Sequence, residues 1–111
     1  MVQSPLPDPL IEMIALRFRV LSEPMRIKLL DELRGGPATV NELALATGTS
    51  QQNASKHLAI LHQAGIIRRE KVGTAARYEI ADESVFALCD QVCGGLRQQL
   101  DALNELFEAP A

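Results

Sequence analysis

The chain has 111 residues, of which 47% are hydrophobic and 23% charged, and its formal net charge is −3. This composition excludes a disordered chain and predicts one folded domain whose modest core would gain from dimerisation. No apolar run reaches the ~20 residues that span a bilayer, and the N-terminal residues lack the regions of a secretory signal. We therefore expect a cytoplasmic protein without a membrane partner.

Residues 1–8 contain Pro5 and Pro7 and show no periodicity, which predicts a flexible N-terminal arm. Asp8 followed by Pro9 indicates the start of a first helix, with Asp8 as its cap and proline at the first position. The apolar side of this helix is broader than one packing surface requires, which favours a subunit contact. Its members are Leu10, Ile11, Ile14, Ala15, Phe18 and Leu21.

The tripeptide Ser22-Glu23-Pro24 restarts the helical pattern, and Gly35-Gly36-Pro37 ends this second helix. The stretch from Thr39 to Gly65 then predicts two short helices joined by a tight turn. Thr39 and Glu42 have the spacing of a capping box at the start of the first.

Gly48 provides the turn between these two short helices, and Ser50 caps the second. One side of the second helix is apolar, at Ala54, Leu58 and Leu61. The other side carries amides, hydroxyls and a lysine, which are groups that address base edges and phosphates in a major groove. The pattern predicts a helix-turn-helix; the alternative is a solvated helix face in an ordinary bundle.

Residues 66–72 and 76–80 alternate in the manner of strands, and Gly73-Thr74-Ala75 separates them as a turn. We expect a two-stranded hairpin that packs on the helices, because an isolated hairpin is marginal in water. The residues expected to make this packing are Ile67, Tyr78 and Ile80.

Positive charge gathers between residues 50 and 77, which hold five basic residues and one acidic residue, a balance of +4. The remainder of the chain has a balance of −7, from 6 basic and 13 acidic residues. A basic surface on an acidic body favours phosphate on one side. The alternative is chance clustering on a solvated hairpin.

A final helix is predicted from the cap Asp82 to about Glu108, before Pro110. Its apolar residues recur every three or four positions and form one continuous row. A helix of roughly 25 residues extends beyond the core of so small a domain, so part of this row should pack on a partner chain. The row consists of Val85, Cys89, Val92, Leu96, Leu100, Leu103 and Phe107.

With this order of elements, the segments RVLSEPMRIKLLDEL, NELA and SQQNASKHLAILHQAGIIRREKVGTAARYEI resemble the ArsR/SmtB family of winged helix-turn-helix repressors. The resemblance covers Phe18 to about Leu96. It implies a mainly α fold with a small β-hairpin, in which residues 9–108 form a winged helix-turn-helix domain that dimerises through its first and last helices. The implied function is a homodimeric, sequence-specific repressor of a double-stranded DNA operator, with a recognition helix at about 50–64 and a wing at about 66–80.

The same resemblance places a set of side chains on the DNA-reading segment and the wing. Ser50, Gln51, Gln52 and Ser55 are the candidates for base or phosphate contacts, whereas His57 would either contact phosphate or pack beside Leu58. The wing residues would reach the backbone or the minor groove. The full set of predicted DNA-binding residues is Ser50, Gln51, Gln52, Asn53, Ser55, Lys56, His57, Arg69, Lys71 and Arg77.

The residues by which relatives sense metals are missing from this sequence. Arsenic and cadmium sensors of the family carry Cys-x-Cys in the helix before the recognition helix, where this chain has residues 42–46, ELALA. Zinc and nickel sensors use histidine in the last helix, and residues 82–108 contain none. We therefore expect no metal or other cofactor at the usual family sites.

Two cysteines, Cys89 and Cys93, lie four residues apart in the predicted last helix. They act either as small apolar residues in the packed row or as a thiol switch that responds to oxidants, sulfur species or soft metals. A different class of function is a winged-helix module that binds proteins. The sequence has no Ser/His/Asp order, paired catalytic carboxylates or phosphate loop, so we expect no enzyme.

Overall fold

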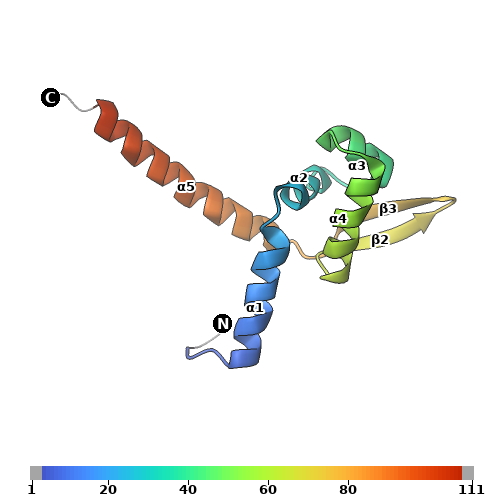
Figure 1. Ribbon diagram of the computed structural model, residues 1–111, viewed down its shortest axis with the longest axis horizontal. Coiled ribbons are helices and arrows are strands. Elements are labelled where there is room, and N and C mark those ends of the chain that lie inside the picture. The colour runs from blue at the N-terminus through green and yellow to red at the C-terminus, as the bar shows by residue number, and fades with distance from the viewer. Residues whose placement is uncertain (1–3, 109–111) are drawn as a thin grey trace. The chain divides into compact units, whose positions relative to one another are not determined.

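The computed structural model describes residues 4–108, which form five helices and three short strands (Figure 1). In chain order these are α1 (Asp8–Leu21), α2 (Pro24–Leu33), β1 (Ala38–Thr39), α3 (Val40–Thr47), α4 (Gln51–Gln63), β2 (Ile67–Val72), β3 (Ala75–Ile80) and α5 (Ser84–Glu108). The mainly helical class with a small hairpin is thereby confirmed.

The chain divides into two compact units, one ending at Ala81 and the other beginning at Asp82. The division predicted from the sequence, an arm over residues 1–8 and one domain over residues 9–108, stays a prediction. Residues 1–3 of that arm lie outside the described residues.

The starts of α3 and α4 are fixed by side-chain caps, as the sequence predicts. Thr39 Oγ1 accepts a hydrogen bond from Glu42 N at 3.2 Å, and Glu42 Oε1 accepts one from Thr39 N at 2.9 Å. Ser50 Oγ accepts from Asn53 N at 3.1 Å at the start of α4. Between the two helices, Gly48 has a φ of 70°, a left-handed conformation that glycine adopts without a Cβ penalty. The turn of the helix-turn-helix is therefore defined by local chemistry.

The start of α1 differs from the prediction, because Pro7 and not Asp8 is its cap. The carbonyl oxygen of Pro7 accepts hydrogen bonds from Leu10 N and Ile11 N, at 3.0 and 3.1 Å. Asp8 is therefore already helical, and its carboxylate stands in the first turn, where the helix dipole favours negative charge.

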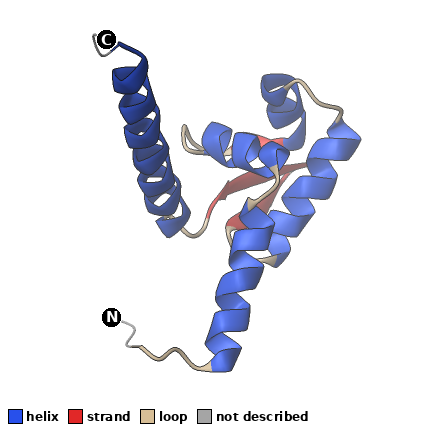
Figure 2. Cartoon of the chain, turned by 60° about the vertical axis from the view of Figure 1, so that its left-hand side comes forward, coloured by secondary structure: helices blue, strands red, loops and turns tan. Residues whose placement is uncertain are grey.

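The predicted hairpin is confirmed, but it belongs to a three-stranded antiparallel sheet in the order β1-β3-β2 (red in Figure 2). The strand β1 is not expected from the sequence; its two residues pair with β3 at Ala38↔Tyr78 and Thr39↔Arg77. The hairpin turn is shorter than predicted, because Ala75 already belongs to β3. The extra strand ties the N-terminus of α3 directly to the wing.

The core of the first unit lies where α2, α3 and α4 meet the sheet. Leu29, Leu58, Leu61 and Ile66 are fully buried, and each such side chain contributes about 1.5–3 kcal/mol of transfer free energy. Ile67 and Tyr78 pack as predicted and are 2% and 8% exposed, whereas Ile80 is half-buried.

The second unit is the 25-residue helix α5, which runs without a break through Gly94 and Gly95. Asp82 Oδ1 accepts a hydrogen bond from Ser84 N at 3.0 Å, so the predicted role of Asp82 at this helix start is confirmed. No helix in the described part of the chain is long and apolar enough to cross a membrane. The row's side chains from Val92 onward are exposed, at 51–87% of their area: Val92, Leu96, Leu100, Leu103 and Phe107.

We predict that Thr39→Ala lowers the free energy of unfolding by about 1 kcal/mol, because the α3 capping box loses its hydroxyl acceptor. Urea denaturation measures this change. Thr39→Ser retains the hydroxyl and should stay within a few tenths of a kcal/mol of the parent. Equal losses in the two variants would show that the cap does not stabilise α3.

Candidate nucleic-acid interface

The helix α4 presents a polar face because its opposite face is buried. Ala54, Leu58 and Leu61 are 0% exposed and fix the rotation of the helix about its axis. Most of the predicted reading residues are consequently on the outside: Ser50, Gln51, Gln52, Ser55 and Lys56 are all exposed. The apolar face of α4 thus packs in the core, and its polar face is exposed to solvent.

Two of the predicted amides at the N-terminus of α4 hold neighbouring side chains. Gln51 Nε2 donates to Asn41 Oδ1 of α3 at 2.7 Å, and Asn53 Nδ2 donates to Thr49 Oγ1 at 2.9 Å. Asn53 is also half-buried, unlike Gln51. Asn53 therefore holds the turn, whereas Gln51 remains at the surface with part of its amide unused.

His57 lies on the buried side of α4 and is only 8% exposed. Its Nδ1 is 3.2 Å from Arg26 Nη1. Because a guanidinium only donates hydrogen bonds, Nδ1 must be the acceptor and the ring proton resides on Nε2. Of the two roles that the sequence left open for His57, this geometry favours packing.

Arg26 connects α4 to the end of α1. Its Nε donates to Val20 O at 2.6 Å, and its Nη2 donates to Arg19 O at 3.4 Å. These carbonyls lie in the last turn of α1, where the helix leaves backbone acceptors without helical partners. Ser22 N and Oγ also donate to Arg19 O, at 3.2 and 2.7 Å, so the main contribution of Arg26 at this helix end is its bond to Val20 O. The same guanidinium holds His57.

Burial lowers the pKa of His57 below its ordinary value of 6.5, and the positive charges of Arg26 and Lys56 lower it further. The carboxylate of Glu23 acts in the opposite direction. The neutral ring is consistent with the acceptor role of Nδ1, since protonation would remove the lone pair that Arg26 uses and place two cations in contact.

The wing divides its predicted basic residues between two faces. Paired residues of antiparallel strands point to the same side, so the register Arg69↔Tyr78 and Lys71↔Ala76 places Arg69 and Lys71 on the face of the buried Tyr78. Arg77 is on the opposite face, directly across from Glu70. The structure therefore groups Arg69 with Lys71 and separates Arg77 from both.

Arg77 is also close to an acidic group of α3. The pKa of Glu42 lies below its ordinary value, mainly because Glu42 accepts the backbone and side-chain hydrogen bonds of Thr39, and to a smaller extent because of the charge of Arg77. Arg77 is thus close to the carboxylate of Glu42 and lies across from Glu70 in the sheet, and its contact with phosphate stays a prediction.

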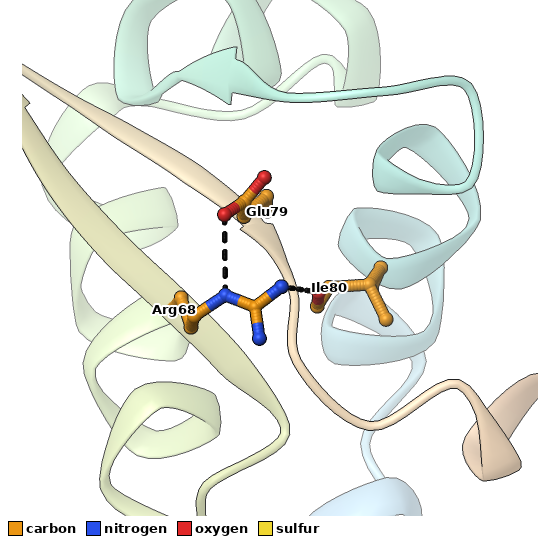
Figure 3. Close-up of polar contacts among 3 residues, drawn as sticks. All are labelled: Arg68, Glu79 and Ile80. Carbon is orange, nitrogen blue, oxygen red and sulfur yellow. Dashed lines mark hydrogen bonds and ion pairs between the residues drawn. The ribbon is translucent and has the colours of Figure 1, made fainter.

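Arg68 is held within the wing. Its Nε donates to Glu79 Oε1 at 3.1 Å and its Nη2 to Ile80 O at 3.2 Å (Figure 3). Glu79 lies just outside the basic segment defined from the sequence, so residues 50–80 have five basic and two acidic residues, a balance of +3. The surface remains basic, with one of its cations already paired.

The two thiols of α5 are free; Cys89 is half-buried and Cys93 is exposed. Arg97 Nη2 lies 4.0 Å from Cys93 Sγ. Among residues 4–108, no three His, Cys, Asp or Glu side chains come together in a group that could hold a metal ion.

Two residues that contact side chains of α4, Arg26 on its buried side and Asn41 at the surface, are not predicted by the sequence. Their roles depend on partners 31 and 10 positions away in the chain. The sequence marks them only as polar residues beside apolar ones. Arg26 lies between Met25 and Ile27, and Asn41 follows Val40. Such a signal does not identify the partner.

A capped helix, a tight turn, a second helix with an exposed polar face and a basic hairpin beside it define a winged helix-turn-helix DNA-binding domain. Comparisons with known proteins agree. A helix-turn-helix domain family matches residues 21–70. The HTH-type transcriptional regulator NmtR of Mycobacterium tuberculosis is 31% identical over 88 residues, which are 79% of this chain and 73% of NmtR.

Solved structures give the same assignment. The homodimeric winged helix-turn-helix domain of Mb0332 from Mycobacterium bovis, a possible ArsR-family regulator, matches with a TM-score of 0.75 and 28% identity, over 90% of this chain and 95% of that one. The antimony-specific repressor AntR matches with a TM-score of 0.79 and 25% identity, over 89% and 90%. The chain belongs to the ArsR/SmtB family of winged helix-turn-helix transcriptional regulators, which confirms the resemblance found in its sequence.

We predict that the free energy of unfolding decreases as the pH falls below about 6.5. The fold lowers the pKa of His57, so it favours the neutral ring; that stabilisation is complete above the unfolded pKa and is lost as the pH falls through the folded one. Urea denaturation at about pH 7.5 and pH 5.5 measures the difference.

Two variants isolate the contribution of His57. In His57→Gln the side chain keeps an acceptor for Arg26 but does not titrate, so the pH dependence should become smaller. His62→Gln is the matched control on the exposed side of α4 and should leave the parent's dependence unchanged. An unchanged dependence in His57→Gln would contradict the assignment.

Proposed function

We propose that this regulator represses transcription as a homodimer whose two α4 helices enter successive major grooves of a pseudo-palindromic operator. The observation that supports this most directly is the exposed polar face of α4, which its buried apolar face holds in one orientation. The wing adds phosphate affinity on the side of Arg69 and Lys71.

The roles of individual residues follow from their surroundings. Gln51, Gln52 and Ser55 are exposed and carry the donors and acceptors that read base edges. Ser50 and Lys56 are exposed as well, and we assign them to phosphate contacts. Asn53 and His57 have hydrogen-bond partners within the protein, and we assign them to support of the interface instead of direct readout. Arg77 stays a candidate for phosphate contact on the opposite face of the wing.

Two exposed apolar surfaces support the homodimer. One lies on α1, where Ile11, Leu16 and Phe18 are 47%, 56% and 53% exposed, and the other is the row on α5. Exposed apolar area of this extent marks a protein contact. The similar Mb0332 domain is a homodimer. We further propose that the regulator acts in the cytoplasm and has no enzymatic activity.

We predict different losses for a base contact and a phosphate contact. Gln52→Ala should lower the preference for operator over random DNA by about tenfold, because a base contact is lost. Lys71→Ala should weaken binding to both DNAs evenly and lower the salt slope by about 1. Gel-shift titrations on both DNAs at two salt concentrations measure these changes.

Gln63→Ala, at the exposed far end of α4, is the matched control and should behave as the parent. Equal losses on both DNAs for Gln52→Ala would remove this residue from the readout. If the parent itself showed no sequence preference, the alternative of a winged-helix protein-interaction module would be favoured.

A second candidate function is a thiol-responsive switch at Cys89 and Cys93. Cys93 is exposed, so its sulfur is accessible to an oxidant or a soft metal ion, and Arg97 Nη2 lies 4.0 Å from Cys93 Sγ. The similar AntR is an antimony-specific repressor. The competing role for these cysteines is apolar packing in the row on α5.

We predict that a thiol oxidant or a thiophilic metal ion releases the parent from operator DNA. The Cys89→Ser, Cys93→Ser double variant should stay bound, because serine lacks the sulfur chemistry. Gel shifts before and after treatment measure release, and untreated variant and parent should bind alike. A variant that responds as the parent does would exclude the switch.

A further inference from the structure

The side chains of Gln51 and Asn41 form one polar unit across the turn of the helix-turn-helix. Gln51 is the first residue of α4, Asn41 is the second residue of α3, and Gln51 Nε2 donates to Asn41 Oδ1 at 2.7 Å. Both residues are exposed on the surface that carries the candidate reading residues. The hydrogen bond therefore orients an amide that would otherwise rotate freely in solvent.

The backbones that carry the two amides are themselves fixed. The Thr39–Glu42 capping box and the pairing of Thr39 with Arg77 in the sheet hold the start of α3. Ser50, which accepts from the backbone of Asn53, holds the start of α4. Gln52, the next amide along α4, is exposed as well, but no such bond joins it to α3 within the described residues. Gln51 is thus the better oriented of the two.

The hydrogen bond leaves a defined set of groups for a ligand. Gln51 keeps its Oε1 acceptor and its second N–H donor, and Asn41 keeps the two donors of its Nδ2. A donor next to an acceptor in one amide plane is complementary to the major-groove edge of adenine, which presents the N7 acceptor and the N6 donor. Guanine presents two acceptors there and would leave Gln51 Oε1 facing another acceptor.

We infer that Asn41 is a specificity-determining residue, which holds the amide of Gln51 in the plane that reads one adenine in each operator half-site. Asn41 acts here as a positioning residue for the base contact. The donors on its Nδ2 are not used in the shared bond and are suited to the phosphate of the same strand. This inference rests on the proposed DNA reading by α4.

A selection experiment with the full chain tests the inference and identifies the preferred DNA sequence in the same step. Duplexes with random sequence are bound to the parent and sequenced, and the affinities of variants are then measured by fluorescence anisotropy on the selected duplex. Two altered forms of the selected duplex are also prepared. In one, the adenine–thymine pair at the position under test is replaced by guanine–cytosine. In the other, that adenine is replaced by 7-deazaadenine, which lacks the N7 acceptor.

In Gln51→Ala, the preference for adenine at one position per half-site should fall about tenfold. Asn41→Ala should lower the preference at that same position by about three- to tenfold, and the double variant should lose no more than Gln51→Ala alone. The 7-deazaadenine duplex should weaken the parent but not Gln51→Ala.

Asn41→Asp distinguishes positioning from a phosphate contact. Its carboxylate still accepts from Gln51 Nε2, so the preference for adenine should persist, whereas affinity for every duplex should fall because a negative charge faces phosphate. Gln52→Ala is the matched control and should change the preference at a different position. Circular dichroism melting checks that each variant keeps the parent's fold.

Several results would overturn the inference. Asn41→Ala with the parent's full preference, or with equal losses on all duplexes, would show that Asn41 does not position the reader. A Gln51-dependent preference for another base would exclude adenine. Failure of the parent to select any sequence would instead refute the proposed function itself, and the inference with it.

Discussion

The burial of the apolar face of α4 is the constraint on which the rest of the interface depends. Ala54, Leu58 and Leu61 have no exposed area, and successive helix residues are about 100° apart around the axis. A rotation of α4 by one residue would bring a leucine into water and cost about 1.5–3 kcal/mol for that side chain alone. The direction of the polar face is therefore set by the core and needs no DNA to define it.

Hydrogen bonds from Arg26 add to this apolar packing and connect α4 to α1. Arg26 donates to the last carbonyls of α1 and to His57 on α4, so the same guanidinium contacts a helix that exposes apolar residues and a helix that exposes polar ones. Removing Arg26 would take this donor from the Val20 carbonyl and from the ring nitrogen of His57, whereas the Arg19 carbonyl would keep the hydrogen bonds from Ser22 N and Oγ. The surface proposed for dimer contact on α1 and the surface proposed for DNA contact are in this way oriented by one side chain.

Local chemistry explains which parts of the structure could be predicted. The capping box at Thr39, the left-handed Gly48 and the Ser50 cap each depend on residues at most three apart, and the structure confirms them. By contrast, β1 has two residues and exists because β3 pairs with it, so its own sequence holds too little information. The Arg26–His57 and Asn41–Gln51 contacts likewise depend on the packing of whole helices. Family resemblance supplied the class of site, but not these partners.

The net charge of the whole chain differs in sign from the net charge of its first folded unit. The first unit holds 10 basic and 8 acidic residues, a balance of +2, whereas the second holds Arg97 and six acids, a balance of −5. The negative sign of the net charge is therefore set by the second unit and does not describe the unit that carries the polar helix and the wing. Electrostatic attraction to phosphate decays over about 8 Å at physiological ionic strength, so it responds to nearby charges and not to the total. For the surface proposed to contact DNA, the relevant quantity is therefore the +3 balance of residues 50–80, in which Arg68 is already paired to Glu79.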